Sequence, residues 1–248
     1  MMTKLLTFGL IAALANIAGG YWLTSRRRIS PQLLARLVGL GAGFMLAAVF
    51  LEVVPAAIEL GRWHNQVEIP MGLILGGYLL LQFFEHTVVP HFHLGEETHS
   101  DALLNSRVMV AAVSGLAMHT FFDGVSIAAG FLVDLKLGLL IFIAIVLHKI
   151  PDGVTVASIV LASGRSKRLA QYATLFVGGA TLAGVVMVAI IQGSVSYALP
   201  LSAGVTLYVA ASDLIPEVNK EGVFISFVVF AGVALFSLTD RLIEGLGL

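Results

Sequence analysis

The amino-acid sequence predicts an all-α membrane protein whose fold is built from eight transmembrane helices. Hydrophobic residues make up 58% of the 248 positions and charged residues only 12%, whereas soluble proteins are about a quarter charged. The hydrophobic residues gather in long runs that charged or turn-forming residues separate. A chain this apolar needs lipid as its solvent, where helices can satisfy every backbone polar group internally.

Eight apolar runs are each long enough to cross a hydrocarbon core about 30 Å thick at about 1.5 Å per residue. In chain order the predicted spans cover residues 5–23, 34–60, 69–89, 108–133, 135–162, 169–193, 196–215 and 223–243. The joins between them are short, apart from a His-bearing loop over residues 90–106. We therefore expect a single transmembrane domain that occupies residues 1–248.

The basic residues predict how the spans are oriented. The first apolar run could be mistaken for a signal peptide, but one lysine precedes it and three arginines follow it, which favours an uncleaved span with its N-terminus outside. Joins after odd-numbered spans hold Arg26, Arg27, Arg28, Arg36, Arg107, Arg165, Lys167, Arg168 and Lys220, whereas the opposite side holds Lys4, Arg62, Lys136 and Arg241. This asymmetry predicts extracytoplasmic termini and a cytoplasmic loop at 90–106.

Composition also excludes several classes of site. The chain has no cysteine, so disulfides, thiolate metal sites and cysteine nucleophiles are excluded. The formal net charge of −1 and the lack of a basic domain give no indication of nucleic-acid binding. Any metal ion must therefore be held by imidazole, carboxylate or thioether groups.

A short pattern recurs near the two ends of the chain. Glu52 lies three residues before Pro55 in the second span, and Asp213 lies three residues before Pro216 in the seventh. The recurrence predicts a 3+2+3 arrangement in which spans 1–3 and 6–8 are inverted copies around a central pair. Such repeats are common in transporters, whose sites lie at the membrane midplane.

Spans four and five carry the residues with the clearest chemistry. His119 and Asp123 lie four positions apart, as do His148 and Asp152, so each pair shares one helix face. Their nitrogen and oxygen donors suit Zn²⁺, Fe²⁺, Mn²⁺ and Co²⁺. The alternative is a structural polar contact between helices. The metal site is favoured because an ionised aspartate at the bilayer centre costs about 2.5–3.5 kcal/mol and this chain has two.

Other polar residues are weaker candidates. Glu52 fits an ion pathway better than a solvated helix end, whereas Asp213 fits an inner exit site and an interfacial acid equally well. The loop holds His91, His93 and His99, and such a tract either binds metal weakly or is an ordinary polar loop.

These motifs resemble those of the ZIP family of divalent-metal transporters. HTFFDG at 119–124 and HKIPDG at 148–153 are similar to the family's motifs in spans four and five. FLEVVPAA at 50–57 and GVTLYVAASDLIPEV at 204–218 are similar to its spans two and seven. The resemblance covers essentially all eight spans. It implies that spans 1, 4, 5 and 6 rock against spans 2, 3, 7 and 8.

The resemblance also implies a site for two metal ions. The first-ion ligands map onto His119, Asp123, His148 and Asp152, with Glu52 at the position of the span-two ligand. The second-ion positions map onto Thr120, Lys149 and Thr181. A charged lysine has no lone pair and cannot ligate a metal, so we expect the second site to be absent. Our hypothesis is that the Lys149 ammonium replaces the second ion, and the alternative is a lysine that extends to the membrane surface.

The sequence thus predicts a non-enzymatic transporter that moves Zn²⁺ into the cytoplasm across the cell inner (plasma) membrane. Fe²⁺, Mn²⁺, Co²⁺ or Cd²⁺ are other substrates that the donor set allows. A homodimer is a further expectation. The alternatives are a membrane metalloenzyme, whose usual His-rich motifs are missing from the sequence, and an exporter that uses the same site.

Overall fold

The computed structural model describes residues 1–25, 30–60, 66–88, 106–220 and 222–247. These residues form helices and no strand. Along the chain the helical elements are α1 (Met2–Thr24), α2 (Pro31–Ala48), η1 (Val49–Val53), α3 (Val54–Glu59), α4 (Glu68–Phe83), η2 (Phe84–Val88), α6 (Ser106–Val133), α7 (Leu135–Ala162), α8 (Lys167–Ile190), η3 (Gln192–Ser194), α9 (Val195–Tyr208), η4 (Val209–Leu214), α10 (Ile215–Asn219) and α11 (Val223–Gly245). Because η1, η2 and η4 are π-helical turns that continue their neighbours, the described residues make eight rods.

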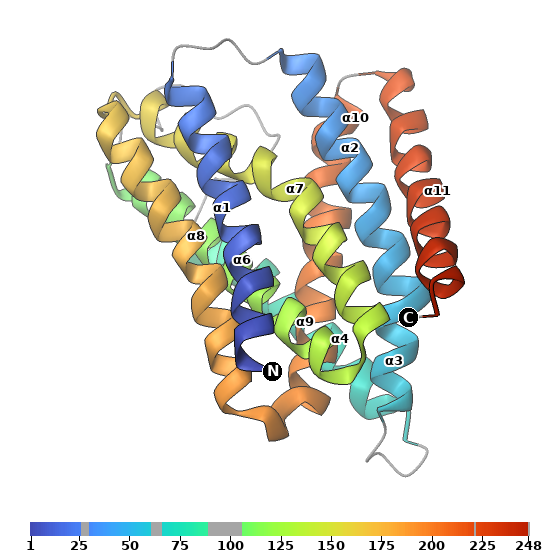
Figure 1. The fold of residues 1–248 in the computed structure, drawn as a ribbon. Helices are drawn as coiled ribbons and strands as arrows, with labels where there is room; N and C mark the ends of the chain where they lie inside the picture. The colour runs from blue at the N-terminus through green and yellow to red at the C-terminus, as the bar shows by residue number, and fades with distance from the viewer. Residues whose placement is uncertain (26–29, 61–65, 89–105, 221, 248) are drawn as a thin grey trace.

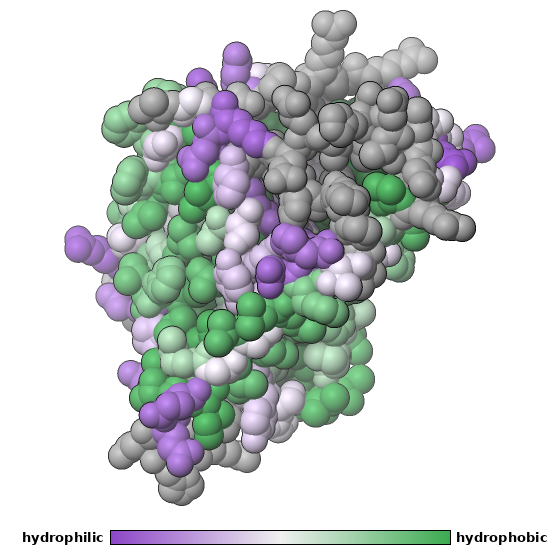
Figure 2. All heavy atoms as spheres, turned by 180° about the vertical axis from the view of Figure 1, so that it is seen from behind, coloured by the Kyte–Doolittle hydropathy of each residue, from purple (hydrophilic) through white to green (hydrophobic). Residues whose placement is uncertain are grey.

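The rods have the length and composition of membrane spans. By these two properties, seven helices of the described residues could cross a membrane, namely Met2–Thr24, Gln32–Glu59, Val108–Val133, Leu135–Ala162, Lys167–Ile190, Val195–Leu214 and Phe224–Gly245. The predicted span 69–89 corresponds to α4 and η2, whose α-helical part has 16 residues. Hydrophobic residues cover much of the face between the two ends in Figure 2. The chain is thus an all-helical, multi-pass membrane protein.

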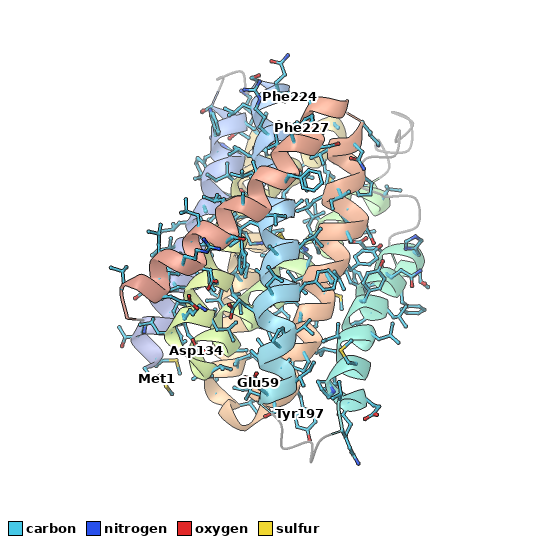
Figure 3. All side chains as sticks on the ribbon, turned by 90° about the vertical axis from the view of Figure 1, so that its right-hand side faces the viewer. Met1, Glu59, Asp134, Tyr197, Phe224 and Phe227 are labelled. Atoms are coloured by element: carbon cyan, nitrogen blue, oxygen red, sulfur yellow. The ribbon has the colours of Figure 1, made fainter. Side chains whose placement is uncertain are left out.

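The helices pack in two groups. In the first, α1, α6, α7 and α8 contact one another most extensively, and in the second the closest pairs are α4 with α9 and α2 with α11. Contacts of α2 with α7 and of α6 with α9 join the groups. Both termini lie at the same end of the bundle (Figure 1), which is also where Asp134 and Glu59 lie (Figure 3).

Glycines at the crossings of the first group, Gly124 and Gly153 among them, let its helices approach closely. A Cβ atom at Gly153 would lie 1.8 Å from the backbone oxygen of Asn16 in α1. One at Gly124 would lie 2.0 Å from the backbone oxygen of Thr181 in α8. Small residues at helix contacts are the usual means of close packing in membranes. Both glycines directly follow an aspartate of the predicted site, so these crossings fix where the aspartates lie.

Replacing Gly124 by alanine should therefore destabilise the bundle. The new methyl group would overlap a backbone oxygen that has no alternative rotamer, and such overpacking costs about 1–3 kcal/mol. Thermal unfolding of the purified protein in detergent measures the effect. Gly76→Ala in α4 is the matched control, because a Cβ there meets no atom within 4 Å. Equal midpoints for the two variants would contradict the close approach.

The recurring acid-to-proline pattern has the same local structure in both copies. Val54, which precedes Pro55, donates its N–H to the carbonyl of Val49, and Ile215, which precedes Pro216, donates to the carbonyl of Ala210. Each bond spans five residues instead of four. A proline removes one helical donor and its ring clashes with the carbonyl four residues earlier, so a π-turn before it relieves that clash. Such turns occur often at functional positions, and these two carry Glu52 and Asp213.

Candidate metal site

Two adjacent helices bring the predicted ligands together in the interior of the first group. His119 and Asp123 lie on α6, and His148 and Asp152 lie on α7. All four are buried. Each residue offers one nitrogen or oxygen atom, and the four atoms lie within 4.8 Å of one another. Residues that are 29 positions apart in the sequence therefore form one compact donor set.

The two imidazoles and the two carboxylates face a common centre. The Nε2 atom of His119 lies 3.1 Å from Oδ2 of Asp123 and 3.4 Å from Oδ2 of Asp152. The Nε2 atom of His148 lies 3.5 Å and 3.7 Å from the same two oxygens. The imidazole rings meet edge to face, with centroids 5.6 Å apart. Around one tetrahedral zinc ion with bonds of ~2.0–2.2 Å, neighbouring donor atoms lie about 3.3–3.6 Å apart, so these spacings fit a single ion.

Hydrogen bonding leaves donor atoms free to bind a metal. Nδ1 of His148 lies 3.0 Å from the carbonyl oxygen of Ala144, so the ring N–H donates there and Nε2 of the neutral ring keeps its lone pair. A partner of this kind is typical of metal-binding histidines. Nε2 of His119, Nε2 of His148 and Oδ2 of Asp123 are buried and form no hydrogen bond of good geometry. Buried polar atoms without such bonds are rare, and a cation would satisfy all three.

Lys149 lies inside this cluster and is fully buried. Its Nζ contacts Oδ2 of Asp123 and lies 3.1 Å from Oδ2 of Asp152. It also donates to Oγ1 of Thr120 at 3.2 Å. A lysine that reaches the membrane surface would be partly exposed, so the contacts favour an internal counter-charge over that alternative.

The third residue of the second-ion set, Thr181, lies on α8 and is fully buried. Its Oγ1 has no hydrogen-bond partner in the described structure. Its backbone packs against Gly124, the neighbour of Asp123. The three positions that the resemblance maps to a second ion thus carry two threonines and a lysine, and none of them carries a carboxylate.

Glu52 lies apart from the four clustered residues. Its Oε1 is 3.2 Å from Nζ of Lys136, which precedes Lys149 by thirteen positions and so lies about 20 Å away along α7. The α2 helix passes the site at Gly41, where a Cβ atom would lie 3.4 Å from Cβ of His148. The ligand position that the resemblance implies for Glu52 is therefore not reproduced in this structure.

Asp213 lies on η4 and is buried among groups that the sequence does not single out. Glu85 on η2 is close enough for the two charges to interact, and it accepts a hydrogen bond from the hydroxyl of Tyr208. On α4, Tyr78 shares a hydrogen bond of 2.8 Å with Ser212, the neighbour of Asp213. Nothing in the sequence spacing of Glu85 indicates this pairing. His91, His93 and His99 lie outside the described residues.

Comparison with known families decides what kind of protein carries this site. A family model described as ZIP zinc transporter matches residues 90–240, which is more than half of the chain. The chain belongs to the ZIP zinc transporter family. The match includes all four clustered residues together with Lys149 and Asp213.

Individual relatives support the assignment. The chain is 31% identical over 137 residues to "Zinc transporter SLC39A7" of Rattus norvegicus, covering 51% of this chain and 29% of the relative. It is 31% identical over 141 residues to "Zinc transporter ZIP13 homolog" of Drosophila melanogaster, covering 52% and 39%. It is 27% identical over 172 residues to "Zinc transporter ZIP9" of Micropogonias undulatus, covering 64% and 55%. The chain thus matches between about a third and about half of the length of these ZIP proteins.

Proposed function

We propose that this protein transports Zn²⁺ across a membrane through the site formed by His119, Asp123, His148 and Asp152. The observation that supports this most strongly is a compact set of two imidazoles and two carboxylates, buried where helices α6 and α7 meet. Burying two aspartates in a membrane protein is unfavourable unless a cation compensates them. Family membership supports zinc as that cation.

The donor set suits the task of binding a dehydrated divalent ion and releasing it again. Two neutral imidazoles and two carboxylates match a borderline metal such as Zn²⁺. The same ligands accept Fe²⁺, Mn²⁺, Co²⁺ and Cd²⁺, which we propose as weaker substrates. Because a ligating histidine must be unprotonated, the affinity of the site for zinc should fall at low pH.

We further propose that the site binds one ion and that Lys149 replaces a second. The Nζ contacts with Asp123, Asp152 and Thr120 support this. In the metal-free protein the ammonium compensates part of the carboxylate charge, so the empty site carries less unpaired charge. When zinc enters, it shares the two carboxylates with the lysine.

The chain as a whole forms, in this proposal, one transporter domain in the plasma membrane with both termini outside. The group of α1, α6, α7 and α8 moves against the group of α2, α4, α9 and α11, and zinc moves toward the cytoplasm. The matching π-turns before Pro55 and Pro216 support an inverted repeat. Glu52 and Asp213 then lie on the route at its two ends, with the loop histidines as an exit site. A homodimer is part of the same proposal.

Family membership argues against the metalloenzyme alternative. An exporter would use the same ligands, and only the direction of flux separates it from an importer. Zinc flux into liposomes that contain the purified protein tests the proposal, with the protein inserted in a known orientation. Flux above that of protein-free liposomes, directed to the side that bears the 90–106 loop, is expected. Hydrolysis or oxidation by the purified protein without any zinc flux would instead support the enzyme.

A further inference from the structure

A second lysine, Lys136, lies among carboxylates at the end of the molecule opposite to Phe224 and Phe227. It belongs to the first turn of α7, two residues after Asp134 (Figure 3). Its Nζ lies 2.7 Å from Oδ1 of Asp240, 2.8 Å from Oε1 of Glu244 and 3.2 Å from Oε1 of Glu52. One cation therefore holds three anions.

These ion pairs connect the two helix groups. Lys136 is carried by α7, which packs mainly against α1, α6 and α8. Its partners lie on η1 and on α11, which belong to the second group. Both elements pack mainly against the α2 rod. Any movement that separates the groups at this end must break all three contacts at once.

The space between Lys136 and the metal site is narrow. A cavity of about 20 Å³ lies there, which is enough for roughly one water molecule. Its lining is mostly apolar and comes from both groups, with Val49, Val53, Ile141, Ile145 and Ser126 among its residues. A hydrated zinc ion has no room to pass in this state, so the end at Lys136 must open if ions enter from it.

Exposure distinguishes Lys136 from Lys149. The side chain of Lys136 is 21% exposed and that of Lys149 is 0% exposed. Partly exposed ion pairs are weak and reversible because water can replace either partner, whereas a fully buried pair cannot separate without a large desolvation penalty. Lys136 is therefore suited to contacts that form and break, and Lys149 to a permanent one.

We infer that Lys136 is an ionic latch that holds the two helix groups together at the Asp134 end while the site is closed to that side. The inference rests on the proposed transport function, since the latch acts by limiting how often this end opens. When the latch breaks, α7 loses its attraction to the carboxylates of η1 and α11, and the repulsion between Glu52 and Asp134 at the start of α7 is no longer offset.

Cysteine labelling tests the latch directly, because the chain has no cysteine of its own. Val53→Cys places a thiol in the closed cavity, and a membrane-impermeant thiol reagent reports in liposomes how often the cavity opens. With Lys136→Gln added, we expect labelling at least about tenfold faster. Lys136→Arg keeps the charge and should label at the original slow rate. Equal rates for the glutamine and arginine variants would overturn the inference.

Two further variants keep the result interpretable. Asp240→Asn with Glu244→Gln weakens the latch from the other helix group and should also accelerate labelling, whether or not Lys136→Gln folds normally. Glu59→Cys, which is exposed at the same end, should label rapidly in every background. Labelling requires no zinc flux, so a failed latch leaves the transport proposal standing, and absent transport leaves the labelling result valid.

Discussion

Replacing His119 or Asp123 by alanine is expected to abolish zinc uptake into liposomes. Each substitution removes one of four donors that lie within 4.8 Å of one another. The remaining three cannot complete the tetrahedral set that zinc prefers in protein sites. Losing a group that only supports a ligand typically costs about 10–100-fold, so we expect the loss of a ligand itself to reduce the initial rate by more than about 100-fold.

The matched control for this experiment is His86→Ala. That residue also lies on a helical turn, but its side chain is exposed and its Nδ1 approaches the carbonyl of Gln82. The control should transport zinc at close to the original rate. Size-exclusion profiles of all variants establish that they fold. Transport that persists in His119→Ala or Asp123→Ala would remove the cluster from the pathway.

The second large effect is expected from Lys149→Met in the metal-free protein. The methionine has similar length but no charge, so Asp123 and Asp152 lose the cation that contacts both of them. Removing one partner of a buried ion pair costs about 3–5 kcal/mol. Thermal unfolding in the presence of a chelator should therefore show a much lower midpoint than that of the unmodified protein.

Zinc should restore most of this loss, because the ion supplies the positive charge that the variant lacks and binds only the folded state. Lys167→Met is the matched control, since Lys167 is exposed at the start of α8. Its midpoint should change little with or without zinc. If Lys149→Met is as stable as this control under chelation, Lys149 is not the counter-charge of the site.

Much of the fold could be predicted from the sequence because membrane insertion imposes a simple pattern. Each span is an apolar run of a length set by the bilayer, so the eight helical rods follow the predicted runs to within a few residues. Three rods differ from the prediction in their winding. The helices α2, α4 and α9 pass into the π-turns η1, η2 and η4, a change that hydrophobicity does not indicate.

The four-residue core of the site could also be predicted, because His119 and Asp123 share a face, as do His148 and Asp152. What joins the two pairs is the packing of α6 on α7, which the spacing within each helix does not determine. Which atoms Lys149 contacts depends on the side chains that this packing places around its ammonium group.

The surroundings of Glu52 could not be predicted in the same way. Its partner Lys136 lies 84 positions later in the chain, and the other two partners of that lysine, Asp240 and Glu244, lie later still. Single carboxylates near helix ends are ordinary features of a membrane protein. Only the arrangement of helices identifies these ion pairs as a connection between the two helix groups.

The number of tightly bound zinc ions per chain tests the central claim most directly. Equilibrium binding with the purified protein should give one ion at high affinity for the natural sequence. Lys149→Glu replaces the ammonium by a carboxylate, so it should raise the count to two. Two tightly bound ions in the unmodified protein, together with no increase in Lys149→Glu, would contradict a site in which Lys149 takes the place of the second metal.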